Sequence, residues 1–278
     1  MPELAEVECV RRGLTRAKLR APIESVWRSD LPLRIGKTWR QERLGAITGG
    51  TGVRWGRRGK FLLWRLDTPR GDAGLVVHLG MTGRLVVGTP DDPLAPHTHL
   101  RISFADGREL RFVDARRFGG LRAGPWQALL DEAPLSALGP EPLSRGFDAS
   151  TLAARGGASR RTIYAVLLDQ RVVAGLGNIY VQEALYRAGV RPSRRAHQVT
   201  GPQWERLAAA IVEVLRQGIA HGGTSFRDYR NAAGQRGRNQ ERLWVYGRAG
   251  LVCRGCGGVL RGYEEGGRRG VFCPREQR

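Results

Sequence analysis

The chain is poor in lysine. Of its 46 basic residues only three are lysines, Lys18, Lys37 and Lys60, and the others are arginines. Arginine binds phosphates well but stays protonated at neutral pH, so it cannot serve as a proton-transferring amine. Lys60, at the start of the apolar run FLLW, is therefore a candidate for chemistry, although a charge that merely flanks a strand is an equally ordinary explanation.

Cysteines and long apolar runs are also scarce. Three of the four cysteines lie near the C-terminus and Cys9 stands alone, which argues against the disulfide framework of a secreted protein. No apolar run reaches about 18 residues, and acidic residues closely follow Met1. We therefore expect neither a membrane span nor a secretory signal.

Acidic residues are few compared with basic ones. There are 26 Asp and Glu against 46 Lys and Arg, which gives a net charge of +20 and an isoelectric point near 11.3. Such an excess indicates a polyanionic partner. The arginines are spread along the whole chain, which favours nucleic acid over an acidic membrane surface. The expected location is the cytoplasm, in association with the nucleoid.

Turn signals and apolar periodicity divide the chain into four parts. Residues 1–130 begin with a helical apolar stripe and continue as strand-like runs, the pattern of a β-sandwich or barrel. A proline-rich linker over 131–147 leads to helical spacing in 148–240, and 241–278 form a small cysteine module. The predicted class is α+β, with an N-terminal β-sandwich that carries a helix, a helical domain and a C-terminal hairpin resembling a zinc ribbon.

The cysteine module contains most of a zinc-binding motif. Cys253 and Cys256 form one CxxC pair, and Cys273 follows after sixteen intervening residues. Glu276 occupies the position that would complete a second pair, so three cysteines and one carboxylate are the candidate ligands of one zinc ion. The alternative is a metal-free hairpin with three reduced thiols. We favour zinc because so small a module has little core of its own.

Taken together, these segments resemble the formamidopyrimidine-DNA glycosylase family, base-excision repair enzymes that remove oxidised purines. The resemblance covers essentially the whole chain, through MPELAEVE, GRRGKFLL, HLGMTGRL, DARRFGG, LLDQRVVAGLGNIY, GGTSFRDY, LWVYGR and the cysteine module. It implies a catalytic β-sandwich with the first helix, a helix-two-turn-helix domain and a zinc ribbon. The implied partner is double-stranded DNA containing oxidised bases, bound by a monomer.

The resemblance implies roles for four catalytic residues. Once Met1 is removed, Pro2 presents a secondary amine whose attack on C1′ of the damaged nucleotide gives a cationic iminium, an electron sink for elimination. Glu3 is placed to give or take a proton at the sugar. Lys60 takes a proton-transfer and phosphate-side role, and Arg268 is implicated in phosphate binding and the second elimination. Glu6 is expected to hold the helix end in place.

The resemblance also implies contacts with DNA. An enzyme that acts on a base must extrude it and fill the gap in the stack. The candidates for filling that gap are Met81, Arg116 and Phe118. The residues expected to contact phosphates are His97, Arg160 and Asn178.

The chain departs from the family pattern at several positions. Ala5 replaces a proline, Tyr164 a lysine and Gln182 an acidic residue, while Arg238 and Asn239 replace an aromatic pair in the segment thought to close over the flipped base. These departures leave Pro2 chemistry intact but put base specificity in doubt.

The predicted function is therefore that of a bifunctional DNA glycosylase and abasic-site lyase. It is expected to remove 8-oxoguanine and formamidopyrimidines through an N-terminal proline Schiff base, followed by β,δ-elimination. One alternative keeps the chemistry but shifts it to oxidised pyrimidines or ring-opened adducts. An alternative of another class is a non-enzymatic nucleic-acid-binding zinc-ribbon protein, which explains the charge and the cysteines equally well.

Overall fold

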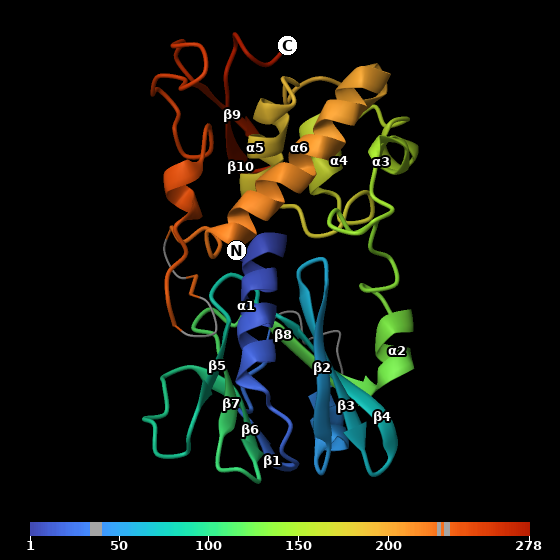
Figure 1. Cartoon of the computed structure of the whole chain (residues 1–278), viewed down its shortest axis with the longest axis vertical. Helices are drawn as coiled ribbons and strands as arrows, with labels where there is room; N and C mark the ends of the chain where they lie inside the picture. Colours follow the sequence, from blue (N-terminus) through green and yellow to red (C-terminus); the bar gives the residue numbers. More distant parts are fainter. Residues whose placement is uncertain (34–40, 227–228, 231–233) are drawn as a thin grey trace. The chain divides into compact units, whose positions relative to one another are not determined.

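The computed structural model of the chain describes residues 1–33, 41–226, 229–230 and 234–278, which form two compact units (Figure 1). The first unit comprises Met1–Ser136 together with His221–Arg238. The second comprises Ala137–Ala220 together with Asn239–Arg278. Among the residues described, no helix is both long and apolar enough to cross a membrane.

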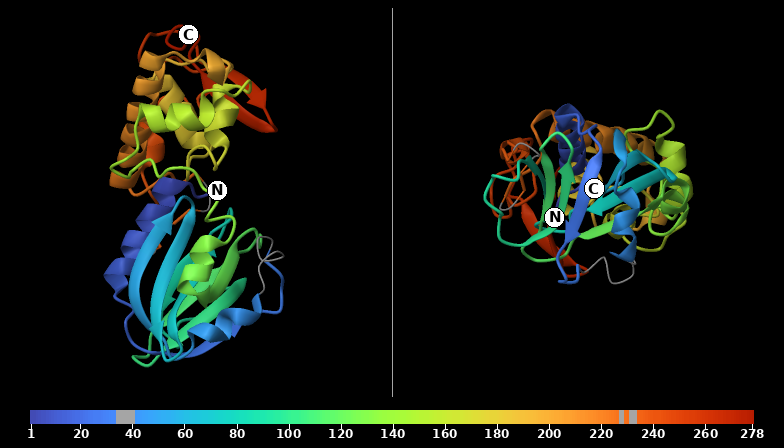
Figure 2. Two further views of the ribbon diagram at one scale, coloured as in Figure 1. Left: turned by 90° about the vertical axis from the view of Figure 1, so that its right-hand side faces the viewer. Right: turned by 90° about the horizontal axis from the view of Figure 1, so that it is seen from below.

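The first unit begins with a helix whose boundaries follow from local sequence. Helix α1 spans Leu4–Ala17 and starts with a capping box, in which the N–H of Glu3 donates to Glu6 Oε2 over 2.9 Å. It ends at Ala17, and the C-cap residue Lys18 adopts a left-handed conformation. Its buried apolar face contains Leu4, Val7, Val10 and Leu14. The helix runs alongside the strands of this unit (Figure 2).

The strands described in this unit form two antiparallel sheets of four, in the orders β1-β6-β7-β5 and β2-β3-β4-β8. Their bounds are β1 Ile23–Arg28, β2 Thr51–Arg58, β3 Phe61–Thr68, β4 Gly71–His78, β5 Arg84–Gly88, β6 Thr98–Phe104, β7 Glu109–Val113 and β8 Gly120–Pro125. A 3-10 helix, η2 (Gln41–Ile47), precedes β2, and α2 (Trp126–Asp131) follows β8. Apolar side chains of both sheets and of α1 share one buried core, so the predicted β-sandwich is confirmed.

The second unit combines helices with a C-terminal hairpin. Its elements are α3 Ala149–Gly156, α4 Ile163–Leu168, α5 Asn178–Arg187, η3 Ala196–Gln198, α6 Gly201–Ala220, η4 Asn239–Arg242, β9 Arg261–Glu265 and β10 Arg268–Phe272. Helix α5 packs against α4, α6 and β10. Two glycines with positive φ, Gly266 and Gly267, form the tight turn between β9 and β10. The predicted α+β class, with a helical part and a ribbon-like hairpin, is confirmed.

The division of the chain differs from the predicted one at residues 221–238. The sequence places them in the helical domain 148–240, whereas in the structure they belong to the first unit. The N–H of Thr224 donates to Glu6 Oε1 over 2.8 Å, and the hydroxyl of Tyr229 donates to the Glu6 carbonyl over 3.2 Å. Both hydrogen bonds are buried, so they hold this segment on α1.

Candidate active site and nucleic-acid interface

Pro2 and Glu3 stand at the start of α1. Pro2 is buried and Glu3 is 3% exposed, whereas Met1 before them is 54% exposed. Pro2 directly precedes the N-cap Glu3, a place where its missing N–H costs no helical hydrogen bond. The capped helix therefore holds the Pro2 nitrogen at a defined place, while Met1 is accessible to removal.

Glu6 connects this helix start to the 221–238 segment. Its Oε2 accepts from the Glu3 N–H, and its Oε1 accepts from the Thr224 N–H. Ser225 consolidates the segment, since its hydroxyl donates to the Tyr229 carbonyl and accepts from the Gly237 N–H. One buried carboxylate thus holds both the helix start at Glu3 and the backbone at Thr224.

Lys60 lies in the turn between β2 and β3 and is only 7% exposed. Arg57, near the end of β2, ties this turn to α1. Its guanidinium donates to the Gly59 carbonyl over 3.1 Å and to Glu8 Oε2 over 3.3 Å. Helix α1 also packs against β2 and β3. The structure therefore brings the turn that carries Lys60 up to α1.

His78 is a candidate active-site residue that the sequence alone did not indicate. It ends β4 and pairs with Phe61, the residue after Lys60. Burial, together with the positive charge of Lys60, lowers its pKa to about 4. The imidazole is therefore neutral at pH 7, and because Nδ1 accepts from the Gly80 N–H over 3.0 Å, Nε2 carries the proton. Its position in HLGMTG, three residues before Met81, was the available signal.

Glu8 illustrates how α1 is held to the sandwich. Its carboxylate accepts from Arg11 over 2.8 and 2.9 Å and from Arg12 over 2.9 Å, and also contacts Arg57. Burial alone would raise the pKa of Glu8, but the hydrogen bonds from Arg11 and Arg12 and the charges of Arg11 and Arg57 outweigh it and lower the pKa to about 2.

We expect Glu8→Gln to lower the free energy of unfolding at pH 7 by about 3 kcal/mol, because each unit of pKa shift is worth about 1.4 kcal/mol. A depressed pKa gives stability that is present above the unfolded value of 4.5 and is lost as the pH falls towards about 2. Urea unfolding at several pH values tests this. The exposed Glu24→Gln is the matched control, and equal acid sensitivity of the two variants would contradict the assignment.

The structure brings the gap-filling candidates Met81, Arg116 and Phe118 together. Met81 is 37% exposed in the turn after β4, and the Arg116 guanidinium lies 4.5 Å from the centre of the Phe118 ring. A Cβ on Gly80 would come within 2.3 Å of the Phe118 backbone, so only glycine permits the two loops to pack this closely. The N–H of Arg116 also donates to the Thr82 hydroxyl over 3.2 Å.

The predicted phosphate-contacting residues fall in both units. His97 is exposed in the loop before β6, and its carbonyl accepts from the Asp114 N–H over 3.0 Å, next to the DARRFGG loop. Arg160 is exposed shortly before α4. Asn178 is the first residue of α5, and its Nδ2 donates to the Arg269 carbonyl over 3.0 Å. Arg268 is therefore adjacent, along β10, to a residue that contacts Asn178.

Glu183 is a buried residue that binds a distant segment of backbone, and the sequence alone did not indicate this role. Its carboxylate accepts from three consecutive N–H groups in the LWVYGR segment, those of Trp244, Val245 and Tyr246, over 2.8 to 3.0 Å. Burial raises its pKa although these hydrogen bonds oppose the rise. The carboxylate fixes the segment that leads into the cysteine module.

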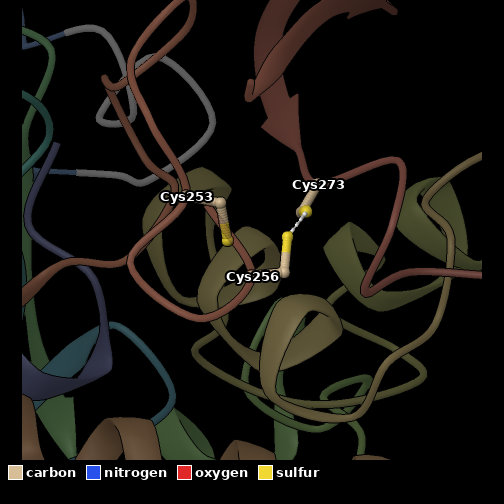
Figure 3. A group of neighbouring side chains, drawn as sticks. All are labelled: Cys253, Cys256 and Cys273. Carbon is tan, nitrogen blue, oxygen red and sulfur yellow. Dashed lines mark hydrogen bonds between the residues drawn. The ribbon is translucent and has the colours of Figure 1, made fainter. Parts of the chain in front are cut away.

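The three C-terminal cysteines point towards one another (Figure 3). Their sulfur atoms all lie within 4.8 Å, and Cys256 Sγ is 3.4 Å from Cys273 Sγ. Burial would raise the pKa of Cys253, but hydrogen bonds from the Tyr186 hydroxyl and from the backbone N–H groups of Cys256 and Gly255 lower it to about 7. A readily formed thiolate beside two further sulfurs is a donor set that suits zinc.

Glu276 is not part of this sulfur cluster. It is exposed in the last turn of the chain. The ligand atoms that lie within 4.8 Å of one another are those of the three cysteines, and the Glu276 carboxylate is not among them. The Tyr186 hydroxyl oxygen lies 3.3 Å from Cys253 Sγ and is therefore a neighbour of the cysteine cluster.

Comparison with family models gives two matches in succession. Residues 1–121 match the formamidopyrimidine-DNA glycosylase N-terminal domain, and residues 138–230 match the formamidopyrimidine-DNA glycosylase H2TH domain. Among curated relatives, the formamidopyrimidine-DNA glycosylase of Moorella thermoacetica is 47% identical over 94% of this chain and 93% of its own length. That of Desulfitobacterium hafniense is 42% identical over 99% of this chain and 98% of its own.

Solved structures agree with these matches. The Lactococcus lactis Fpg protein in complex with abasic-site DNA is 34% identical, with a TM-score of 0.88 over 99% of each chain. The MutM (Fpg) protein from Thermus thermophilus is 38% identical, with a TM-score of 0.87 over 99% of this chain and 98% of its own. The similarity extends far beyond the cysteine module, which argues against a non-enzymatic ribbon protein.

Proposed function

The chain belongs to the formamidopyrimidine-DNA glycosylase family, a family of base-excision repair enzymes, and from this premise we propose that it excises oxidised purines and cleaves the resulting abasic site. The substrates are 8-oxoguanine and formamidopyrimidines in double-stranded DNA. The net charge of +20 supports a polyanionic substrate. The protein acts as a monomer at the nucleoid, in the cytoplasm.

The observation that carries this proposal is the capping box that holds Pro2 and Glu3 at the start of α1. Removal of Met1 converts the Pro2 nitrogen from an amide into a secondary amine, held by the capped end of α1. The amine attacks C1′, the C1′–N bond to the base breaks, and the base leaves with a proton. Opening of the sugar gives a cationic iminium, which accepts the electron pair of the first elimination. Glu3 exchanges protons with the sugar oxygen.

Lys60 and the DNA-contacting residues complete the mechanism. Lys60, buried at the turn beside α1, transfers a proton near the abasic sugar and binds its phosphate. Met81, Arg116 and Phe118 fill the gap that the extruded base leaves in the stack. Asn178, Arg160, His97 and Arg268 bind phosphates, and Arg268 also assists the second elimination. The neutral His78 offers one further N–H donor close to Lys60.

A panel of duplexes that each carry one lesion tests the substrate assignment. We expect 8-oxoguanine opposite cytosine and formamidopyrimidines to be excised faster than thymine glycol. Single-turnover excision rates, measured with the same enzyme preparation, give the comparison. If thymine glycol were excised much faster than 8-oxoguanine, the alternative of an oxidised-pyrimidine enzyme would replace the purine assignment.

We also propose that Cys253, Cys256 and Cys273 hold one zinc ion, with Glu276 or water as the fourth ligand. The mutual distances of the sulfurs support a shared ion. The ion would crosslink the module, which has only a small apolar cluster around Val245, Leu260 and Val271. In that position zinc stabilises the hairpin that carries Arg268 and takes no part in bond breaking.

Purified protein is expected to contain about one equivalent of zinc and to lose DNA affinity when a chelator removes it. Glu276→Cys, which completes the second CxxC pair, should retain zinc at chelator concentrations that strip the original protein. Elemental analysis and fluorescence anisotropy with labelled duplex are the measurements. Fully active protein without zinc would instead support the metal-free hairpin.

A further inference from the structure

Two neutral side chains of the second unit converge on one oxygen of Asn178. The Tyr164 hydroxyl, from α4, donates to Asn178 Oδ1 over 2.7 Å. Gln182, one turn after Asn178 on α5, donates through Nε2 to the same oxygen over 2.6 Å. Tyr164 and Gln182 are each 1% exposed, so both donors are shielded from water.

The other side of this cluster binds the hairpin. Asn178 Nδ2 and Gln182 Nε2 both donate to the Arg269 carbonyl, over 3.0 and 3.3 Å. Gln182 Oε1 accepts from the Val271 N–H over 2.8 Å. The amide of Gln182 therefore links α5 to two residues of β10, the strand whose first residue is Arg268.

From these contacts we propose that Tyr164 and Gln182 are positioning residues that fix the orientation of the Asn178 amide for phosphate binding. If the Asn178 amide were flipped, its NH2 group would face the Gln182 NH2 group, which can only donate, and its oxygen would face the Arg269 carbonyl, which can only accept. One N–H of the Asn178 NH2 group donates to the Arg269 carbonyl. Because the amide is planar, the direction of the second N–H of this group is then fixed as well. This inference rests on the proposed function, in which Asn178 binds a phosphate of the DNA.

The proposal accounts for two departures from the family pattern together. The resemblance places a lysine at position 164 and an acidic residue at position 182, and this chain has neutral donors at both. The structure shows that these two side chains meet at a single atom, so the two departures concern one cluster. Orientation of Asn178 then depends on neutral hydrogen bonds, whose strength depends little on ionic strength.

Tyr164→Phe and Tyr263→Phe form a matched pair for the test. The two rings pack edge to face, with centroids 5.3 Å apart. The Tyr164 hydroxyl bonds to Asn178, whereas the buried Tyr263 hydroxyl has no hydrogen-bond partner within the described part of the chain. Each substitution removes one hydroxyl from the same aromatic pair, but only Tyr164→Phe releases Asn178.

We expect Tyr164→Phe to weaken binding of a duplex with a tetrahydrofuran abasic-site analogue roughly tenfold, the usual effect of losing one well-placed hydrogen bond. KM for lesion DNA should rise by a similar factor, with kcat at saturating DNA unchanged and the loss similar at low and high salt. Tyr263→Phe should bind as the original protein does. Equal losses in the two variants would overturn the proposal, because packing alone would then explain them.

A double-mutant cycle shows whether Tyr164 acts through Asn178. Tyr164→Phe combined with Asn178→Ala should bind no more weakly than Asn178→Ala alone, whereas additive losses would overturn the proposal. Failure of the proposed function is a separate result, since it would appear as absence of lesion excision by the original protein. The binding cycle on the uncleavable analogue can be measured in either case.

Discussion

Borohydride reduction during turnover is expected to leave the enzyme covalently attached to lesion-containing DNA through the nitrogen of Pro2. Reduction converts the iminium into a stable amine, and mass spectrometry of the adduct places it at the processed amino terminus. Pro2→Gly should sharply reduce trapping, and retention of Met1 should abolish it, because an amide nitrogen is not a nucleophile. Salt-sensitive non-specific binding should remain, since the net charge of +20 is nearly unchanged.

Lys60→Arg is the variant to compare with the Pro2 substitutions in the trapping and turnover measurements. It keeps the charge but removes the amine that transfers protons, so turnover should fall more than DNA binding. Trapping that survived the loss of Pro2 but disappeared in Lys60→Arg would move the nucleophile to the lysine. An absence of trapping in the original protein would contradict the Schiff-base mechanism as a whole.

Glu6→Gln is expected to lower the single-turnover excision rate at least about tenfold. Both carboxylate oxygens of Glu6 accept buried N–H groups, and an amide offers only one acceptor, so one N–H would face another donor. Either the helix start that carries Pro2 or the segment at Thr224 is then displaced. Rapid-quench kinetics, with a thermal melt of the same sample, measure the effect.

The exposed Glu24→Gln is the control for this substitution, since it makes the same chemical change on the surface of the same unit. A lower melting temperature with an unchanged excision rate would show that Glu6 supports only the fold. A reduced rate with nearly unchanged non-specific binding would support its role in placing Pro2.

Local patterns explain what the sequence predicted well. The start of α1 follows from Pro2, Glu3 and Glu6, and the individual strands follow from alternating runs bounded by glycine turns. The pairing of β1 with β6, which are far apart in the chain, does not follow from such local patterns. The clustering of Cys253 and Cys256 follows from their CxxC spacing, and that of Cys273 from a hairpin. At the start of α1 and in the CxxC pair, the relevant residues lie within a few positions of one another in the chain.

Contacts between distant parts of the chain could not be predicted in this way. Thr224 and Glu6 are 218 positions apart, so nothing in the local pattern assigns the 221–238 segment to the first unit. The Glu183 carboxylate likewise accepts hydrogen bonds from N–H groups that lie 61 to 63 positions further along the chain. A glutamate within an amphipathic helix has the same local pattern whether it faces solvent or caps a distant segment, so only the tertiary structure distinguishes the two.

The return of residues 221–238 to the first unit has a consequence for synthesis on the ribosome. The described strands of the β-sandwich all precede residue 126, yet Thr224 and Tyr229, the partners of Glu6, are synthesised about 100 residues later. Until then, Glu6 of the nascent chain lacks the backbone donor that the finished protein gives it. The first unit is therefore completed only after α6 has been translated, and a fragment that ended at Ser136 would remain an incomplete folding unit.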